Sequence, residues 1–121
     1  MNKFVLTIIC AGLLALNTAS AQTDSAPKSV IHVVTVSWKA GTTPEQIQAA
    51  LDGAKALPSK YKGITRVWVK SIKAQGKANA IVMEFADEAA LKAYTDSDAQ
   101  KEWYKAYLPI REASATFDIT N

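Results

Sequence analysis

VIHVVTVSWK, residues 30–39, is the stretch that decides the fold, and it leads directly into a capped helix that begins near residue 44. Two strand-like runs follow, ITRVW at residues 64–68 and AIVMEF at residues 80–85. A second helical region precedes a last strand that ends in TFDIT, residues 116–120. The order β-α-β-β-α-β in about 90 residues is the split βαβ pattern. We therefore expect an α+β domain with helices on one face of an antiparallel sheet.

The first helix carries strong local signals. Thr43 is a typical N-cap, Pro44 occupies the favoured first helical position, and Gln46 completes a capping box. Apolar residues then recur at three- and four-residue spacing, at Ile47, Ala50, Leu51, Ala54 and Leu57. This pattern predicts one buried stripe, and we expect Pro58 to end the helix.

The second helical region divides in two. Asp87 is a plausible N-cap, and the segment after it is expected to turn three side chains inward: Ala90, Leu91 and Tyr94. The run Ser97-Asp98-Ala99-Gln100 has the form of a second capping box. It predicts a break, followed by a new helix through about Leu108 that Pro109 stops.

The first strand is apolar on both faces. One face carries His32, Val34, Val36 and Trp38, and the other carries Ile31, Val33, Thr35 and Ser37. A sheet with one wet face would alternate cleanly between apolar and polar residues. Because the helices cover one face only, we expect a second copy of the chain to cover the other, sheet against sheet. The alternative is a monomer that tolerates a semi-apolar face.

Residues 1–21 have the features of a secretory signal peptide. Lys3 precedes an apolar run from residue 4 to 16, and Ala19-Ser20-Ala21 is a cleavage motif before Gln22. The run is shorter than the roughly 20 residues of a membrane-spanning helix, although an uncleaved anchor is the alternative. We therefore predict a flexible leader at residues 22–29, a domain at residues 30–121, and a periplasmic or secreted location.

Composition excludes several classes of function. The single cysteine, Cys10, lies in the signal segment, so the mature chain has no thiol for catalysis, disulfides or metal ligation. Removing Lys3 from the 14 lysines and arginines leaves 13, against 11 acidic residues, and the two signs are interspersed. We therefore expect no nucleic-acid partner and, after cleavage, no membrane association. With one histidine, no metal or cofactor is expected; haem ligation by His32 has no second signal.

Several segments, in this order, resemble the stress-responsive A/B barrel proteins of the dimeric α+β barrel superfamily. They are residues 30–34, 56–58, 62–64, 80–85, 89–94 and 117–119. The resemblance implies a ferredoxin-like subunit and a homodimer whose two sheets form a barrel. It covers about residues 30–120, nearly the whole mature chain.

The chain departs from this family where the chemistry would lie. Typical members carry a histidine, a proline, any residue and a second histidine where this chain has residues 97–100. In the plant polyketide-cyclase branch, the second histidine is the base, assisted by residues that correspond to His32 and Tyr94. Here Gln100 occupies the base position, and an amide cannot accept a proton near neutral pH. This difference argues against cyclase chemistry.

His32 and Tyr94 are the candidate catalytic residues, and the candidate ligand pocket comprises His32, Tyr94, Gln100 and Trp103. Two interpretations of His32 stay open: it faces a pocket between sheet and helices, or it is a buried residue whose hydrogen bond holds the fold. Trp103 and its aromatic neighbours likewise either line a pocket or pack the core. The favoured function is an exported homodimer that binds a small apolar or aromatic molecule. The alternatives are a cofactor-free enzyme, cyclase-like or monooxygenase-like, using His32 and Tyr94, and a purely structural or partner-binding dimer.

Overall fold

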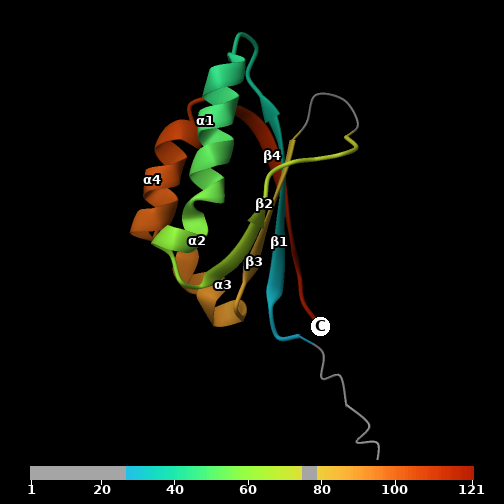
Figure 1. Cartoon of the computed structure of the whole chain (residues 1–121), viewed down its shortest axis with the longest axis vertical. Coiled ribbons are helices and arrows are strands. Elements are labelled where there is room, and N and C mark those ends of the chain that lie inside the picture. Colours follow the sequence, from blue (N-terminus) through green and yellow to red (C-terminus); the bar gives the residue numbers. More distant parts are fainter. Residues whose placement is uncertain (1–26, 75–78) are drawn as a thin grey trace, which may run out of the picture.

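Figure 1 shows two layers in the computed structural model, which describes residues 27–74 and 79–121: helices on one side and a four-stranded sheet on the other. The elements are β1 (Val30–Trp38), α1 (Pro44–Lys55), α2 (Leu57–Lys60), β2 (Ile64–Trp68), β3 (Asn79–Phe85), α3 (Glu88–Tyr94), α4 (Asp98–Tyr107) and β4 (Arg111–Ile119). The strand order is β2-β3-β1-β4, and every neighbouring pair is antiparallel. The ferredoxin-like subunit expected from the sequence is confirmed.

The predicted signal peptide, residues 1–21, lies outside the described residues. Within the described ranges, none of the helices has the length and apolar character needed to cross a membrane.

The first helix begins as predicted and ends differently. The Thr43 side chain accepts from the Gln46 backbone N–H, and the Gln46 side chain accepts from the Thr43 N–H. The expectation that Pro58 ends this helix is wrong. Helix α1 stops at Lys55, and Pro58 lies in the first turn of the short helix α2. Proline lacks the N–H that would continue α1, whereas a first helical turn needs no such donor.

The predicted break in the second helical region is confirmed. Helix α3 ends at Tyr94, Asp96 adopts a left-handed φ of 64°, and the Ser97 side chain accepts from the Gln100 N–H. The Gln100 side chain reaches past the N-cap and accepts from the Asp96 N–H at 2.8 Å. The box is therefore wider than predicted, and it secures the turn between α3 and α4.

One face of the sheet packs against the helices and forms the core. The largest fully buried side chains of this core come from the sheet and from helix α2, and they are Val30, Val36, Leu57, Ile64, Ile81, Met83 and Phe85. Val34 and Val36 are 6% and 1% exposed, so the strand face that also carries His32 is turned toward the helices. The predicted division of β1 into two faces is confirmed, and the structure shows which of them is turned toward the helices.

The opposite face, here called the free sheet face, is apolar and uncovered in the subunit. Val33 lies between Val82 of β3 and Phe117 of β4 in the register, and Ile31 lies opposite Ile119. Its large side chains are exposed: Phe117 by 61%, Ile119 by 57% and Trp68 by 47%. Glu84 is the exception on this face, since it is 7% exposed and forms an ion pair with Arg66.

Candidate functional site

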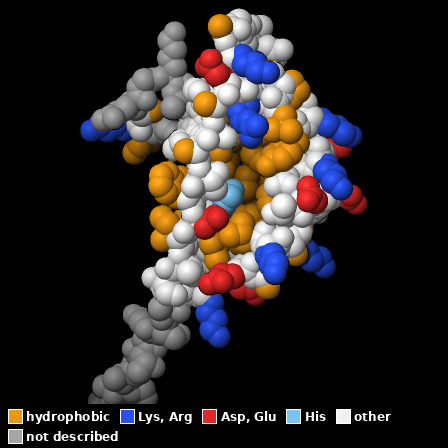
Figure 2. Space-filling view, turned by 180° about the vertical axis from the view of Figure 1, so that it is seen from behind, with side chains coloured by type: hydrophobic (Ala, Val, Ile, Leu, Met, Phe, Trp, Pro, Cys, Tyr) orange, Lys and Arg blue, Asp and Glu red, His pale blue; other side chains and the backbone are white. Residues whose placement is uncertain are grey.

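A cavity of about 120 Å³, here called the aromatic cavity, lies between the sheet and helices α3 and α4. The sheet contributes His32, Val34, Arg111, Ser114 and Thr116 to its lining. The helices and the turn between them contribute Leu91, Tyr94, Thr95, Gln100, Trp103, Tyr104 and Tyr107. Figure 2, from the side opposite to Figure 1, shows a pale-blue histidine side chain among hydrophobic ones where sheet and helices meet. All four predicted pocket residues therefore line the same cavity.

The aromatic wall of the cavity is fixed by helix packing. The Trp103 and Tyr107 rings stack one helical turn apart, with centroids 4.5 Å apart and planes 15° apart. The Trp103 Nε1–H donates to the Ala50 carbonyl oxygen of α1 at 2.9 Å. Gly53 permits this contact, because a Cβ there would lie 3.0 Å from the Trp103 ring. Trp103 thus serves both roles left open by the sequence: it packs the core and lines the cavity.

Two buried tyrosine hydroxyls in the cavity wall have no hydrogen-bond partner in the part of the chain that the structure describes. Tyr94 and Tyr107 are 3% and 2% exposed, and neither hydroxyl has a hydrogen bond within residues 27–74 and 79–121. A buried polar group left in this state costs about 1–3 kcal/mol. Burial, and secondarily Tyr104, raises the pKa of Tyr94. The hydroxyl therefore stays protonated near neutral pH and is available to donate to a ligand.

His32 is held by a carboxylate that the sequence analysis did not identify. Its Nδ1 lies 2.5 Å from the Asp118 Oδ1, and its ring meets Phe85 edge to face. When imidazole is neutral, a carboxylate at Nδ1 favours the proton on that nitrogen and leaves Nε2 as the acceptor. The His32 side chain is 17% exposed. His32 therefore has both properties proposed for it: it is hydrogen-bonded to a neighbour, and it lines the cavity.

Gln100 is a structural part of the cavity wall. Its amide donates to the Tyr104 hydroxyl at 3.2 Å, while its carbonyl oxygen accepts from the Asp96 N–H. Both ends of the side chain are therefore engaged within the turn. This arrangement agrees with the argument from its chemistry that Gln100 supplies no base.

Arg111 is a cavity residue that sequence reasoning missed. Simple alternation along β4 would place it on the free sheet face with Ala113 and Ala115. The register shifts at Ser37/Trp38, so Arg111 lies opposite Trp38, on the side of the helices. Its guanidinium carbon lies 5.7 Å from the centroid of the Tyr107 ring. Within the described chain, Arg111 forms no ion pair.

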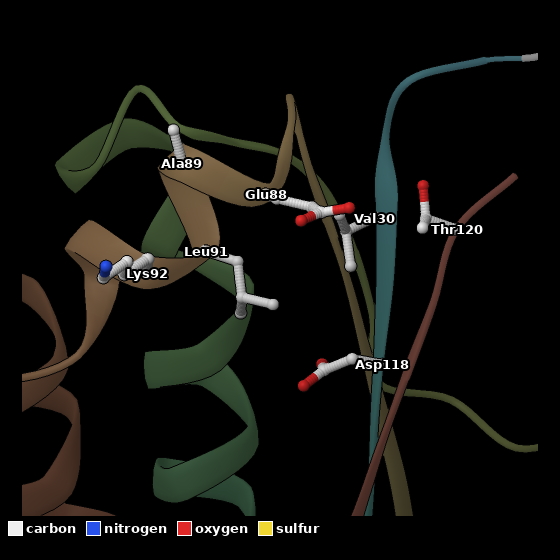
Figure 3. Close-up of a pocket in the computed structure, with 7 residues that line it drawn as sticks. All are labelled: Val30, Glu88, Ala89, Leu91, Lys92, Asp118 and Thr120. Carbon is white, nitrogen blue, oxygen red and sulfur yellow. The ribbon is translucent and has the colours of Figure 1, made fainter.

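A second hollow of about 550 Å³, here called the outer groove, adjoins the cavity (Figure 3). Leu91 lines both spaces, and Asp118, the partner of His32, lines the groove. Figure 3 shows the Leu91 side chain of α3 directed toward the strands, with Asp118 on β4 facing the same space. The groove is larger, but none of the described residues that line it has a buried, unpartnered polar group, so the aromatic cavity is the better candidate site.

Metal binding has no support in this part of the chain. No group of three histidine, cysteine, aspartate or glutamate residues within residues 27–74 and 79–121 could hold a metal ion.

The chain is similar to a known protein family and to solved structures. Residues 30–121 match the family model described as the stress responsive A/B barrel domain. A dimeric ferredoxin-like protein of unknown function from Bacteroides fragilis is similar at 20% identity and a TM-score of 0.65, over 80% of this chain and all of that chain. No curated protein is significantly similar to the chain.

Two enzymes share the fold. A hydroxynitrile lyase from Passiflora edulis is similar at 18% identity and a TM-score of 0.69, over 78% of this chain and 94% of the lyase. A cofactor-independent oxygenase from Streptomyces nogalater is similar at 12% identity and a TM-score of 0.64, over 78% of this chain and 93% of the oxygenase. At these identities the similarity establishes the fold and leaves the activity open.

Proposed function

Because the chain belongs to the stress-responsive A/B barrel domain family, we propose that it is an exported homodimeric barrel protein that binds a small apolar or aromatic molecule in the aromatic cavity. The observation that carries the ligand role is the pair of buried hydroxyls, on Tyr94 and Tyr107, that have no partner among the described residues. Buried polar groups are nearly always hydrogen-bonded, so such a pair in an aromatic-lined space supports an occupant with a polar group.

Binding is tested with a cavity-filling variant. Ser114 lines the cavity from the edge strand β4 and is exposed, so Ser114→Phe adds a ring there with little strain on the core. Ser71→Phe, in an exposed loop outside the cavity, is the matched control. Calorimetry with benzyl alcohol should show binding to the unmutated protein and to the control, and none to Ser114→Phe. Equal binding by all three would reject the cavity as the site.

The homodimer rests on the free sheet face. An apolar surface that includes Ile31, Val33, Phe117 and Ile119 continues across two paired strands. Large exposed apolar patches on soluble proteins mark interaction sites. The similar protein from Bacteroides fragilis is dimeric. Light scattering should give about twice the mass of the processed chain, and a stable monomer would contradict the proposal.

Export rests on the sequence of residues 1–21 alone. Intact-mass analysis of the protein from its host should give a chain that begins at Gln22. A chain that retains Met1 would contradict export by cleavage at this motif.

A cofactor-free enzyme is the second candidate, and the contact of His32 with Asp118 favours it. A histidine whose Nδ1 is held by a carboxylate can act as a general base through Nε2. The fold also supports a lyase and a cofactor-independent oxygenase in other proteins. An enzyme would lose turnover in His32→Ala and most of it in Asp118→Asn, whereas a binding protein would only change its affinity in both variants.

A further inference from the structure

We propose that the aromatic cavity selects the anion of a monocyclic aromatic acid, a benzoate-type carboxylate, and that Arg111 is the residue that selects the charge. This inference rests on the ligand-binding role proposed above and adds the chemical class of the ligand. It has three independent supports: the free hydrogen-bonding groups of the cavity, its size, and the position of the nearby acidic groups.

Three free polar groups of the cavity can donate hydrogen bonds, whereas the Nε2 of His32 is left as an acceptor. The Tyr94 and Tyr107 hydroxyls are buried without partners, and the Arg111 guanidinium lies over the Tyr107 ring without an ion pair in the described residues. On the helix wall, the Gln100 amide and the Trp103 N–H are already engaged, with Tyr104 and Ala50 respectively. Arginine and neutral tyrosine together match an acceptor-only group, such as an ionised carboxylate.

The size of the cavity limits the ligand to one ring. Its volume is about 120 Å³, whereas an apolar cavity of about 150 Å³ is known to hold one benzene molecule. A single ring therefore nearly fills the space between the Trp103–Tyr107 stack and the sheet. Leu91 also lines the outer groove, which offers space for a larger substituent.

The acidic groups around the cavity do not neutralise Arg111, so the end of the cavity at Arg111 stays positively charged. Asp118 is engaged by His32 on the groove side. Asp96 is exposed in the turn between α3 and α4 and does not line the cavity. Glu112, next to Arg111 in the chain, lines a different hollow beside Trp38. An anion bound at Arg111 therefore meets no unpaired carboxylate in the cavity lining.

The test compares benzoate with benzyl alcohol, which has nearly the same shape and no charge. Calorimetric titration of the purified protein at pH 7 should show benzoate binding at least about tenfold more tightly, as expected for a hydrogen bond to a charged group. In Arg111→Gln this preference should disappear while benzyl alcohol still binds. Lys92→Gln, which removes the same charge from the neighbouring groove, should retain the preference.

Two further variants keep the test decisive if Arg111→Gln folds poorly. Arg111→Lys retains the charge and should keep part of the preference, and Tyr107→Phe should weaken benzoate binding more than benzyl alcohol binding. If the unmutated protein binds both probes equally, or benzyl alcohol alone, the selection of an anion is wrong and the ligand-binding role stands. If neither probe binds, the ligand-binding role itself is wrong.

Discussion

The two faces of the sheet are both apolar, yet the helices of the subunit cover only one of them. On the helix-covered face, Phe85 and Met83 are completely buried, and the aromatic cavity lies between this face and helices α3 and α4. On the free sheet face, Phe117 and Ile119 are more than half exposed. The hydrophobic pattern of the strands is thus similar on the two faces, and only the placement of the helices separates a core from an uncovered surface.

This difference assigns separate roles to the two faces. A face closed by helices of the same chain can enclose a small molecule. A face left open needs another partner, because large apolar areas are costly to expose to water. Substitutions on the covered face should therefore change folding and ligand binding, whereas those on the free sheet face should change assembly.

The largest expected loss of stability comes from a substitution on the helix-covered face. Phe85→Ala removes a fully buried ring that contacts the rings of His32, Tyr61 and Tyr94. It should lower the free energy of unfolding by about 3–5 kcal/mol. The matched variant, Phe117→Ala, should instead weaken dimerisation, so its effect in urea unfolding should depend on protein concentration. If both variants lost the same free energy of unfolding, whatever the protein concentration, the distinction between the two faces would be wrong.

Assembly is tested at the centre of the free sheet face. Val33→Asp places a charge between Val82 and Phe117. Burying that charge without a partner costs several kcal/mol, so light scattering should show a folded monomer. Ala49→Asp, on the exposed side of α1, is the control and should leave the dimer intact. A Val33→Asp protein that stays dimeric would show that the partner binds elsewhere.

A substitution in the aromatic cavity should change stability less, and it should not lower it. Tyr94→Phe removes a buried hydroxyl that has no partner in the described structure. Because an unsatisfied buried group is unfavourable, its removal should leave stability unchanged or raise it by up to about 1 kcal/mol. Thermal unfolding of the ligand-free protein measures this change. A loss above about 1 kcal/mol would mean that the hydroxyl already has a partner.

The smallest effect concerns pH and the free sheet face. The hydrogen bond from Arg66 holds the pKa of Glu84 below its ordinary value of 4.5. The pair therefore stabilises the fold above that pH, and the stabilisation is lost as the pH falls through the lowered pKa. Arg66 is largely exposed, so the effect should be slight. The stability difference between the unmutated protein and Arg66→Gln should narrow from pH 7 to pH 3; a constant difference would contradict this role.

Much of the fold could be predicted from local signals. The capping residues Thr43, Asp87 and Ser97 all start helices where expected, and the alternation in β1 correctly divided its residues between two faces. The end of the first helix was wrong, because Pro58 is also suited to opening a new helical turn. Local patterns therefore located the starts of helices better than their ends.

The candidate site was only partly predictable. His32, Tyr94, Gln100 and Trp103 lie on elements whose order the sequence revealed, and they line the same cavity. Asp118 depends on the register of β4 against β1, which no local signal fixes. Arg111 depends on a register shift that reverses simple alternation. The missed residues are those whose positions are set by pairing between distant strands.

The most direct test of the separation between the faces is an NMR titration of the ¹⁵N-labelled dimer with benzoate. We expect chemical-shift changes around His32, Tyr94, Tyr107 and Arg111, with no change around Val33, Phe117 or Ile119 and no dissociation of the dimer. Changes centred on the free sheet face, or a loss of the dimer on binding, would contradict this separation.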